Sequence, residues 1–177
     1  MAIYNAQDNL ERRKRMHEIE PLKTNRATSY KLYINAPMPM VTIFKTFDIT
    51  KLIQLKEKGY KLNMLLCYCI LSAAQKTKEF YLLPIDHKMF QYDQLDISIL
   101  VKNINHELNS CDVSYNDDLD AFNSDYLQRV QQVKETCKDL ELPDHMIIGT
   151  SSLIHHEIDG VINMYSGIFN NPFLIWG

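Results

Sequence analysis

The stretch GYKLNMLLCYCILSAA at residues 59–74 decides the fold of this chain, together with the alternating segment that follows it. Its apolar residues recur at the spacing of one helix face, which predicts a main core helix with the buried positions Leu62, Leu65, Leu66, Cys69, Ile70 and Ala73. Leu95, Ile97, Ile99 and Val101 then alternate with polar residues, and this two-residue period is typical of a half-buried strand. A core helix packed on a sheet is therefore expected.

Local signals place the other helices around this centre. Asp48-Ile49-Thr50 supplies caps for the short amphipathic helix KLIQLKEK, and Gly59 stands where its C-terminal cap belongs. A long helix is expected after residues 116–118 and ends at Pro143, with the buried stripe Leu119, Phe122, Tyr126, Val130, Val133 and Cys137. The basic run at residues 12–15 predicts a short polar helix near the N-terminus.

Strands are expected on both sides of these helices. β-branched and aromatic residues predict a strand over 30–47, broken at Met38-Pro39-Met40, and two short strands joined by a turn over 80–85 and 88–92. Strand character returns over 146–154, 161–169 and 173–176, separated by turn signals. This order predicts an α+β sandwich rather than a doubly wound sheet.

Composition limits the class of protein. The 177 residues are 46% apolar and 23% charged, which is the profile of one domain spanning residues 1–177. The net charge of −3 gives no general attraction to nucleic acid, and no apolar run is long enough to span a membrane. We therefore expect a cytoplasmic protein with neither nucleic acid nor membrane as partner.

The cysteines and most histidines give no catalytic signal. Cys67 and Cys69 form a C-x-C without zinc-site spacing, so we interpret them as buried reduced thiols and expect no bound metal. The histidines at 17, 87, 106 and 145 are isolated in the sequence and are expected at the surface. The chain also lacks the phosphate-loop, dinucleotide, hydrolase-elbow and zincin motifs.

One polar cluster, SSLIHHEIDG at residues 151–160, stands in the apolar C-terminal part. It fits a plain hairpin with a polar tip, an acid–base histidine, or a metal pair, and these alternatives remain open. On a regular strand His155 shares a face with Ser151 and Asp159, whereas His156 lies on the other face. A zinc- or nickel-dependent rise in thermal stability would distinguish the metal alternative.

Five segments in the same order resemble chloramphenicol acetyltransferase. They are FDITKL at 47–52, GYKLNMLLCYCILSAA at 59–74, FQYDQLDIS at 90–98, SYNDDLDAFNSDYLQRV at 114–130, and GTSSL at 149–153 continuing to NPFLIWG at 171–177. The acyltransferase core of 2-oxoacid dehydrogenase complexes is a weaker match. The resemblance implies a two-layer α/β sandwich, with a mixed sheet and helices on one face, assembled as a homotrimer.

The same resemblance implies the chemistry of an antibiotic-resistance enzyme. A histidine acts as general base on an acceptor hydroxyl, which attacks the thioester of acetyl-CoA, and a serine hydroxyl stabilises the oxyanion. Ser151 stands at the position of that serine. Val41, Leu108 and Asn163 fall near positions that line the pocket for the small-molecule acceptor, and Arg15 falls near an arginine that braces the active-site aspartate.

The chain departs from the family at the base. The family carries it in H-H-x-x-x-D-G, whereas this sequence stops at Trp176-Gly177, so we expect the segment with the catalytic histidine to be lacking and activity to be impaired or absent. HHEIDG at 155–160 is one residue shorter than the motif, and His155 or His156 is the alternative base. A non-catalytic binding or oligomerisation module is the alternative function. Asn163 replaces an apolar pocket residue, so the sequence does not identify the acceptor.

Overall fold

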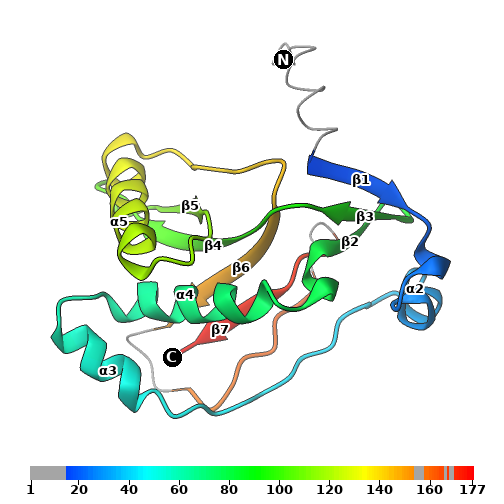
Figure 1. Cartoon of the computed structure of the whole chain (residues 1–177), viewed down its shortest axis with the longest axis horizontal. Coiled ribbons are helices and arrows are strands. Elements are labelled where there is room, and N and C mark those ends of the chain that lie inside the picture. The colour runs from blue at the N-terminus through cyan, green and yellow to red at the C-terminus, as the bar shows by residue number, and fades with distance from the viewer. Residues whose placement is uncertain (1–14, 154–157, 166, 168–169) are drawn as a thin grey trace.

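Two sheets organise the chain, as the computed structural model in Figure 1 shows. The structure describes residues 15–153, 158–165, 167 and 170–177. A three-stranded antiparallel sheet has the order β1-β3-β2, with β1 (Met16–Ile19), β2 (Leu82–Ile85) and β3 (Lys88–Tyr92). A four-stranded sheet has the order β5-β4-β6-β7, with β4 (Leu95–Lys102), β5 (Leu108–Val113), β6 (Met146–Ser152) and β7 (Phe173–Trp176).

The four-stranded sheet is mixed. β5 is antiparallel to β4, whereas β6 is parallel to β4 and β7 is parallel to β6. Two residues link the end of β3 at Tyr92 to the start of β4 at Leu95, so a very short connection joins the two sheets. Asp86 and His87 connect β2 to β3 with positive φ angles of 49° and 61°, the backbone that a two-residue hairpin turn requires.

The helices form the second layer. They are η1 (Pro21–Lys23), α2 (Ala27–Tyr33), α3 (Thr50–Glu57), α4 (Leu62–Ala74), η2 (Lys78–Tyr81) and α5 (Leu119–Thr136). α4 and α5 pack on one face of the four-stranded sheet (Figure 1) and enclose the core with β4 and β6. Met64, Leu71, Ile97, Phe122 and Ile148 are fully buried there. The expected α+β sandwich, two-layered with helices on one face, is confirmed.

The three helices predicted after residue 47 are present, but the buried face predicted for α4 is wrong. Of the positions predicted to be buried, Leu65 alone is classed as buried, and the others with that burial in α4 are Met64, Cys67, Leu71 and Ala74. α4 is apolar around most of its circumference, so several faces satisfy the same spacing and packing chooses between them. Cys69 is correspondingly exposed, against the expectation of a buried thiol.

In α5 the stripe is close to the prediction. Phe122, Tyr126 and Val133 are buried, while Leu119, Val130 and Cys137 are half-buried. Asp118 caps the helix, since its carboxylate accepts a 2.7 Å hydrogen bond from the amide of Ala121. Cys137 ends the helix in the left-handed conformation with φ of 54°.

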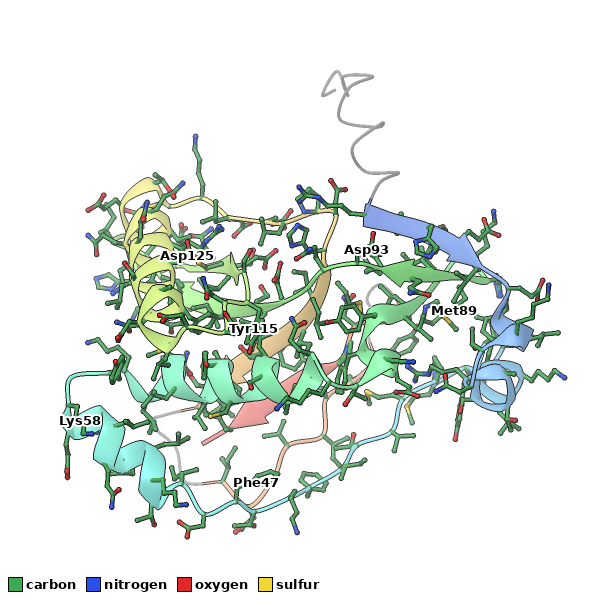
Figure 2. The ribbon with its side chains drawn as sticks, viewed as in Figure 1. Phe47, Lys58, Met89, Asp93, Tyr115 and Asp125 are labelled. Atoms are coloured by element: carbon green, nitrogen blue, oxygen red, sulfur yellow. The ribbon has the colours of Figure 1, made fainter. Side chains whose placement is uncertain are left out.

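Two predicted strands, over 30–47 and over 161–169, are absent from the described residues; positions 166, 168 and 169 of the second lie outside them. Residues 27–33 form α2, and the described chain shows no strand over 34–49 or over 158–165. Ile43 and Phe47 are 84% and 73% exposed, and Figure 2 labels Phe47 on this extended segment at the edge of the molecule. β-Propensity favours an extended backbone, but a strand also needs a partner backbone, and none pairs with these described residues.

β1 and β5 were not predicted. β1 occupies 16–19 directly after the basic run, and the helix expected near residues 12–15 lies mostly outside the described residues. β5 contains Asn109, Ser110 and Asp112, so it lacks a clear apolar alternation. This segment forms a strand because its backbone pairs with β4, although its own sequence shows no strand pattern.

Candidate active site

Ser151 lies near the C-terminal end of β6, opposite Ile175 of β7. Met146, Ile148 and Thr150 are buried against the helices, and the Thr150 hydroxyl donates to the carbonyl of Ser98 at 2.8 Å. Because side chains alternate along a strand, Ser151 faces the side of the sheet opposite the helices. Its half-buried hydroxyl has no hydrogen-bond partner among the described residues, so it is available to a ligand.

Gly149 is required for the packing beside Ser151. A Cβ atom at this position would lie 2.4 Å from a ring carbon of Phe173, so only glycine lets that ring lie over β6. Gly149 and Phe173 are paired across the two strands, two residues before Ser151 and Ile175. The glycine of the GTSS segment therefore places an aromatic ring next to the serine.

Leu108 lies on the same face of the sheet as Ser151. In the β4–β5 pair, Lys102 lies opposite Leu108 and Leu100 lies opposite Ser110. If the register of β4 with β6 is continued by two residues, Leu100 lies beside Ser151. Leu108 is two strands away from Ser151 and displaced by two residues along the strand direction, which corresponds to roughly 12 Å. Leu108 is 65% exposed and Leu100 51%. These leucines and Phe173 give the face around Ser151 an apolar floor.

Leu100 and Phe173 were missed as site residues. The alternation of β4 contained the signal for Leu100, because burying Leu95, Ile97, Ile99 and Val101 on one face leaves Leu100 as an apolar residue on the other. Nothing in the sequence indicated Phe173, since its position depends on the pairing of β7 with β6.

Two other predicted site residues lie on extended segments outside the described strands. Val41, on the segment 34–49, and Asn163, on the segment 158–165, are both exposed. These two segments approach each other at the edge of the molecule (Figure 1), where the ring of Phe44 lies against Gly160 and a Cβ atom on the glycine would be 2.5 Å from it. His155 and His156 lie outside the described residues, so the structure gives no geometry for either as a base.

His145 corrects a prediction, because it is not a surface residue. Its side chain is only 10% exposed, and Nδ1 bonds to Asp96, whose carboxylate is 2% exposed. Nε2 lies 2.8 Å from Nη1 of Arg15. Arg15 therefore reaches an aspartate through His145, at the start of β6. His145 is six residue steps along the chain from Ser151, roughly 20 Å on an extended strand.

The buried thiols are not nucleophiles. Burial raises the pKa of Cys67 to about 12 and that of Cys111 to about 11, so both stay protonated at neutral pH. Within the described part of the chain, no three His, Cys, Asp or Glu side chains are arranged to hold a metal. No helix in the described ranges is both long and apolar enough to cross a membrane.

Solved structures share this architecture. A chloramphenicol acetyltransferase matches with a TM-score of 0.71 and 20% identity, over 90% of this chain and 80% of that chain. A dihydrolipoamide acetyltransferase of Azotobacter vinelandii, studied for the catalytic roles of a serine, a histidine and an asparagine, matches with a TM-score of 0.54 and 19% identity. That match covers 89% of this chain and 71% of the other. This chain therefore shares the fold of these two proteins.

Sequence comparison is more specific. The family model described as chloramphenicol acetyltransferase matches residues 16–156, which include β1 through β6 and Ser151. The chain belongs to the chloramphenicol acetyltransferase family. A comparison with curated protein sequences finds no match.

Proposed function

We propose that this protein is an acetyl-CoA-dependent O-acetyltransferase that moves an acetyl group to the hydroxyl of a small molecule. Membership of the family supports the class of reaction. One observation carries the proposal: the hydroxyl of Ser151, near the end of β6, has no hydrogen-bond partner among the described residues. Acetyl-CoA serves as co-substrate, and the proposed reaction requires no metal.

Ser151 supports the step in which charge develops. The acceptor hydroxyl attacks the thioester carbonyl, a neutral imidazole takes its proton, and the carbonyl oxygen becomes an oxyanion. A hydroxyl that already faces the open side of the sheet can donate to this oxyanion without losing an internal hydrogen bond. Collapse expels the thiolate of coenzyme A, which takes the proton back from the imidazole. His155 or His156 is the proposed base.

The acceptor is proposed to rest on the apolar floor beside Ser151. Leu108, Leu100 and Phe173 supply exposed apolar surface on this face. Val41 and Asn163 are proposed to close the pocket from the two extended segments. The amide of Asn163 would then add a polar contact, which favours an acceptor with more than one polar group.

We further propose that the protein acts as a homotrimer in the cytoplasm, with the acceptor site completed between neighbouring subunits. Exposed apolar residues on the segment 34–49, with Ile43 84% exposed, support burial against another subunit. Sedimentation equilibrium would test this assembly, and a monomer at micromolar concentration would refute it.

A direct assay tests the proposed activity. Release of coenzyme A is followed with chloramphenicol and with a panel of small hydroxyl compounds, and His155→Ala and His156→Ala separate the two imidazoles. Catalysis that depends on one of them identifies the base. If acetyl-CoA and acceptor bind but no acetyl transfer occurs with any compound, the enzyme proposal fails.

The second candidate is a binding or oligomerisation module. HHEIDG at residues 155–160 favours it, because this segment is one residue shorter than the family's H-H-x-x-x-D-G. Saturable binding without turnover would support this function. Failure to bind either acetyl-CoA or chloramphenicol would leave only the oligomerisation role.

A further inference from the structure

A hollow of about 720 Å³ lies beside the three-stranded sheet, in the size range of small-molecule sites. β1, η1, η2, β2 and β3 form it with their adjoining residues, and none of its lining residues belongs to the four-stranded sheet that carries Ser151. Its wall includes Asp93, which Figure 2 labels where β3 passes into β4. The hollow is therefore separate from the proposed acetyl-transfer site.

Hydrogen bonds hold the walls of the hollow in place. Asn25, beyond η1, donates its side-chain amide to the carboxylate of Glu79 in η2, and Arg26 donates to the Glu79 carbonyl at 3.1 Å. The Tyr81 hydroxyl donates to Gln75, whose amide donates to the carbonyl of Leu95 at 2.8 Å. These side chains are already ordered in the folded protein, so ligand binding would cost little additional conformational entropy.

Three polar side chains of the lining are unused. Lys78, Gln91 and Asp93 have no side-chain hydrogen bond or ion pair among the described residues. The backbone at Asp93 is fixed, because its amide donates to the Arg15 carbonyl at 2.9 Å. The hollow thus offers an ammonium, a primary amide and a carboxylate, none of them paired with another described side chain.

The rest of the lining is largely aromatic and aliphatic. Tyr81 and Leu82 come from η2 and β2, and Ile19 and Tyr92 from β1 and β3. Tyr92 and Leu82 are buried, at 6% and 8% exposure, so their contribution is a fixed surface rather than a mobile one. A ligand matched to this lining carries an apolar group as well as charge.

The charges restrict the ligand further. A simple anion would face the carboxylate of Asp93, and a simple cation would face the ammonium of Lys78, so neither satisfies both. We propose that this hollow binds a small zwitterion with an apolar side group, with its carboxylate at Lys78 and its ammonium at Asp93. Free amino acids and short peptides share this chemistry.

Titration of the whole chain, followed by calorimetry or by backbone NMR, tests the proposal. The probes are L-phenylalanine and glycyl-L-phenylalanine, which separate the amino-acid from the peptide source by their charge spacing. 3-Phenylpropionate lacks the ammonium and phenethylamine lacks the carboxylate. At least one zwitterion should saturate the protein, and both singly charged analogues should bind more weakly.

Variants locate the binding. Lys78→Gln and Asp93→Asn should each weaken binding of the zwitterion by about two- to fivefold, the range of partly exposed ion pairs. Lys76→Gln is the matched control, because this nearby exposed lysine does not line the hollow, and it should change nothing. Asp93→Asn should leave binding of 3-phenylpropionate undiminished, since that probe has no ammonium.

Three results would overturn the proposal: no saturation by either zwitterion, equal affinity for all four probes, or equal effects of Lys76→Gln and Lys78→Gln. The titration does not depend on acetyl transfer. If the protein binds the zwitterion but releases no coenzyme A, the proposed binding site stands and the proposed function fails. If it releases coenzyme A but does not bind the zwitterion, the proposed function stands and the binding site fails.

Discussion

The two ends of β6 use polar side chains in opposite ways. At its start, His145 is bonded on both ring nitrogens, to Asp96 and to Arg15, and Asp96 also accepts a 3.0 Å hydrogen bond from the amide of Tyr115. Near its other end, the hydroxyl of Ser151 has no partner among the described residues. One strand thus carries a closed polar cluster and an open polar group.

This difference separates stability from function. A buried polar group that is fully hydrogen-bonded holds elements together, and its loss leaves its partners unpaired. A hydroxyl that bonds nothing internally contributes little to folding and can be used by a substrate. We therefore expect substitutions at the Asp96 end to change unfolding, and substitutions at Ser151 to change chemistry.

The largest effect is expected for Ser151→Ala. Loss of one oxyanion donor should lower kcat for acetyl transfer by about 10²–10³-fold, while the free energy of unfolding changes by less than about 0.5 kcal/mol. Steady-state kinetics and urea denaturation measure the two quantities. Ser152→Ala is the control, and an equal loss of kcat in this variant would contradict the role of Ser151.

Asp96→Ala should lower the free energy of unfolding by about 3 kcal/mol, because the amide of Tyr115 and the ring of His145 both lose their acceptor. Urea denaturation measures the change. Asp93→Ala, three residues earlier and exposed, should cost less than about 0.5 kcal/mol. Equal midpoints for the two variants would show that the closed cluster does not stabilise the fold.

Gly149→Ala should cost about 1–3 kcal/mol of stability, because the added methyl group meets the ring of Phe173. The double variant Gly149→Ala/Phe173→Ala removes the clash and should show a strong favourable coupling between the two sites. Additive effects in this double-mutant cycle would mean that the ring does not lie over β6.

The smallest effect is expected for Arg15→Gln. Arg15 is exposed at the rim of the cluster, so its loss should change the free energy of unfolding by at most about 0.5 kcal/mol. His145→Ala should lower the free energy of unfolding by more, about 1–2 kcal/mol, because the buried carboxylate of Asp96 then accepts one hydrogen bond fewer. If Arg15→Gln lowers the free energy of unfolding more than His145→Ala does, the exposed arginine contributes more to stability than the buried histidine, which contradicts this expectation.

Local signals predicted the elements that lie in the core. The positions of α3, α4 and α5 and of β4, β6 and β7 agree with the prediction, although the spacing within α4 indicated the wrong buried face. The segment around Val41 and Ile43 has the same alternation without a paired strand. Propensity describes a single chain segment, whereas pairing depends on another segment being present.

The candidate site was predictable only in part. The resemblance points to Ser151, whose role stays a prediction, and the alternation of β4 indicates that Leu100 faces the same side. The contact of Phe173 with Gly149 depends on the register of β7. His145 and Asp96 are 49 residues apart, and no short-range pattern signals such a bond. The exposed face of β4 is thus readable from sequence, and long-range pairs are not.

The parallel strands also set the order in which the molecule can be built. The β2–β3 hairpin closes through two residues, whereas β4 meets β6 only when Leu95 finds Met146, and β6 meets β7 when Gly149 finds Phe173. Contacts between such distant residues form slowly, because a long loop must close before any bond rewards it. During synthesis, Ser151 can pair with Ile175 only after β7 has emerged, so this end of β6 gains its second neighbouring strand later than its first.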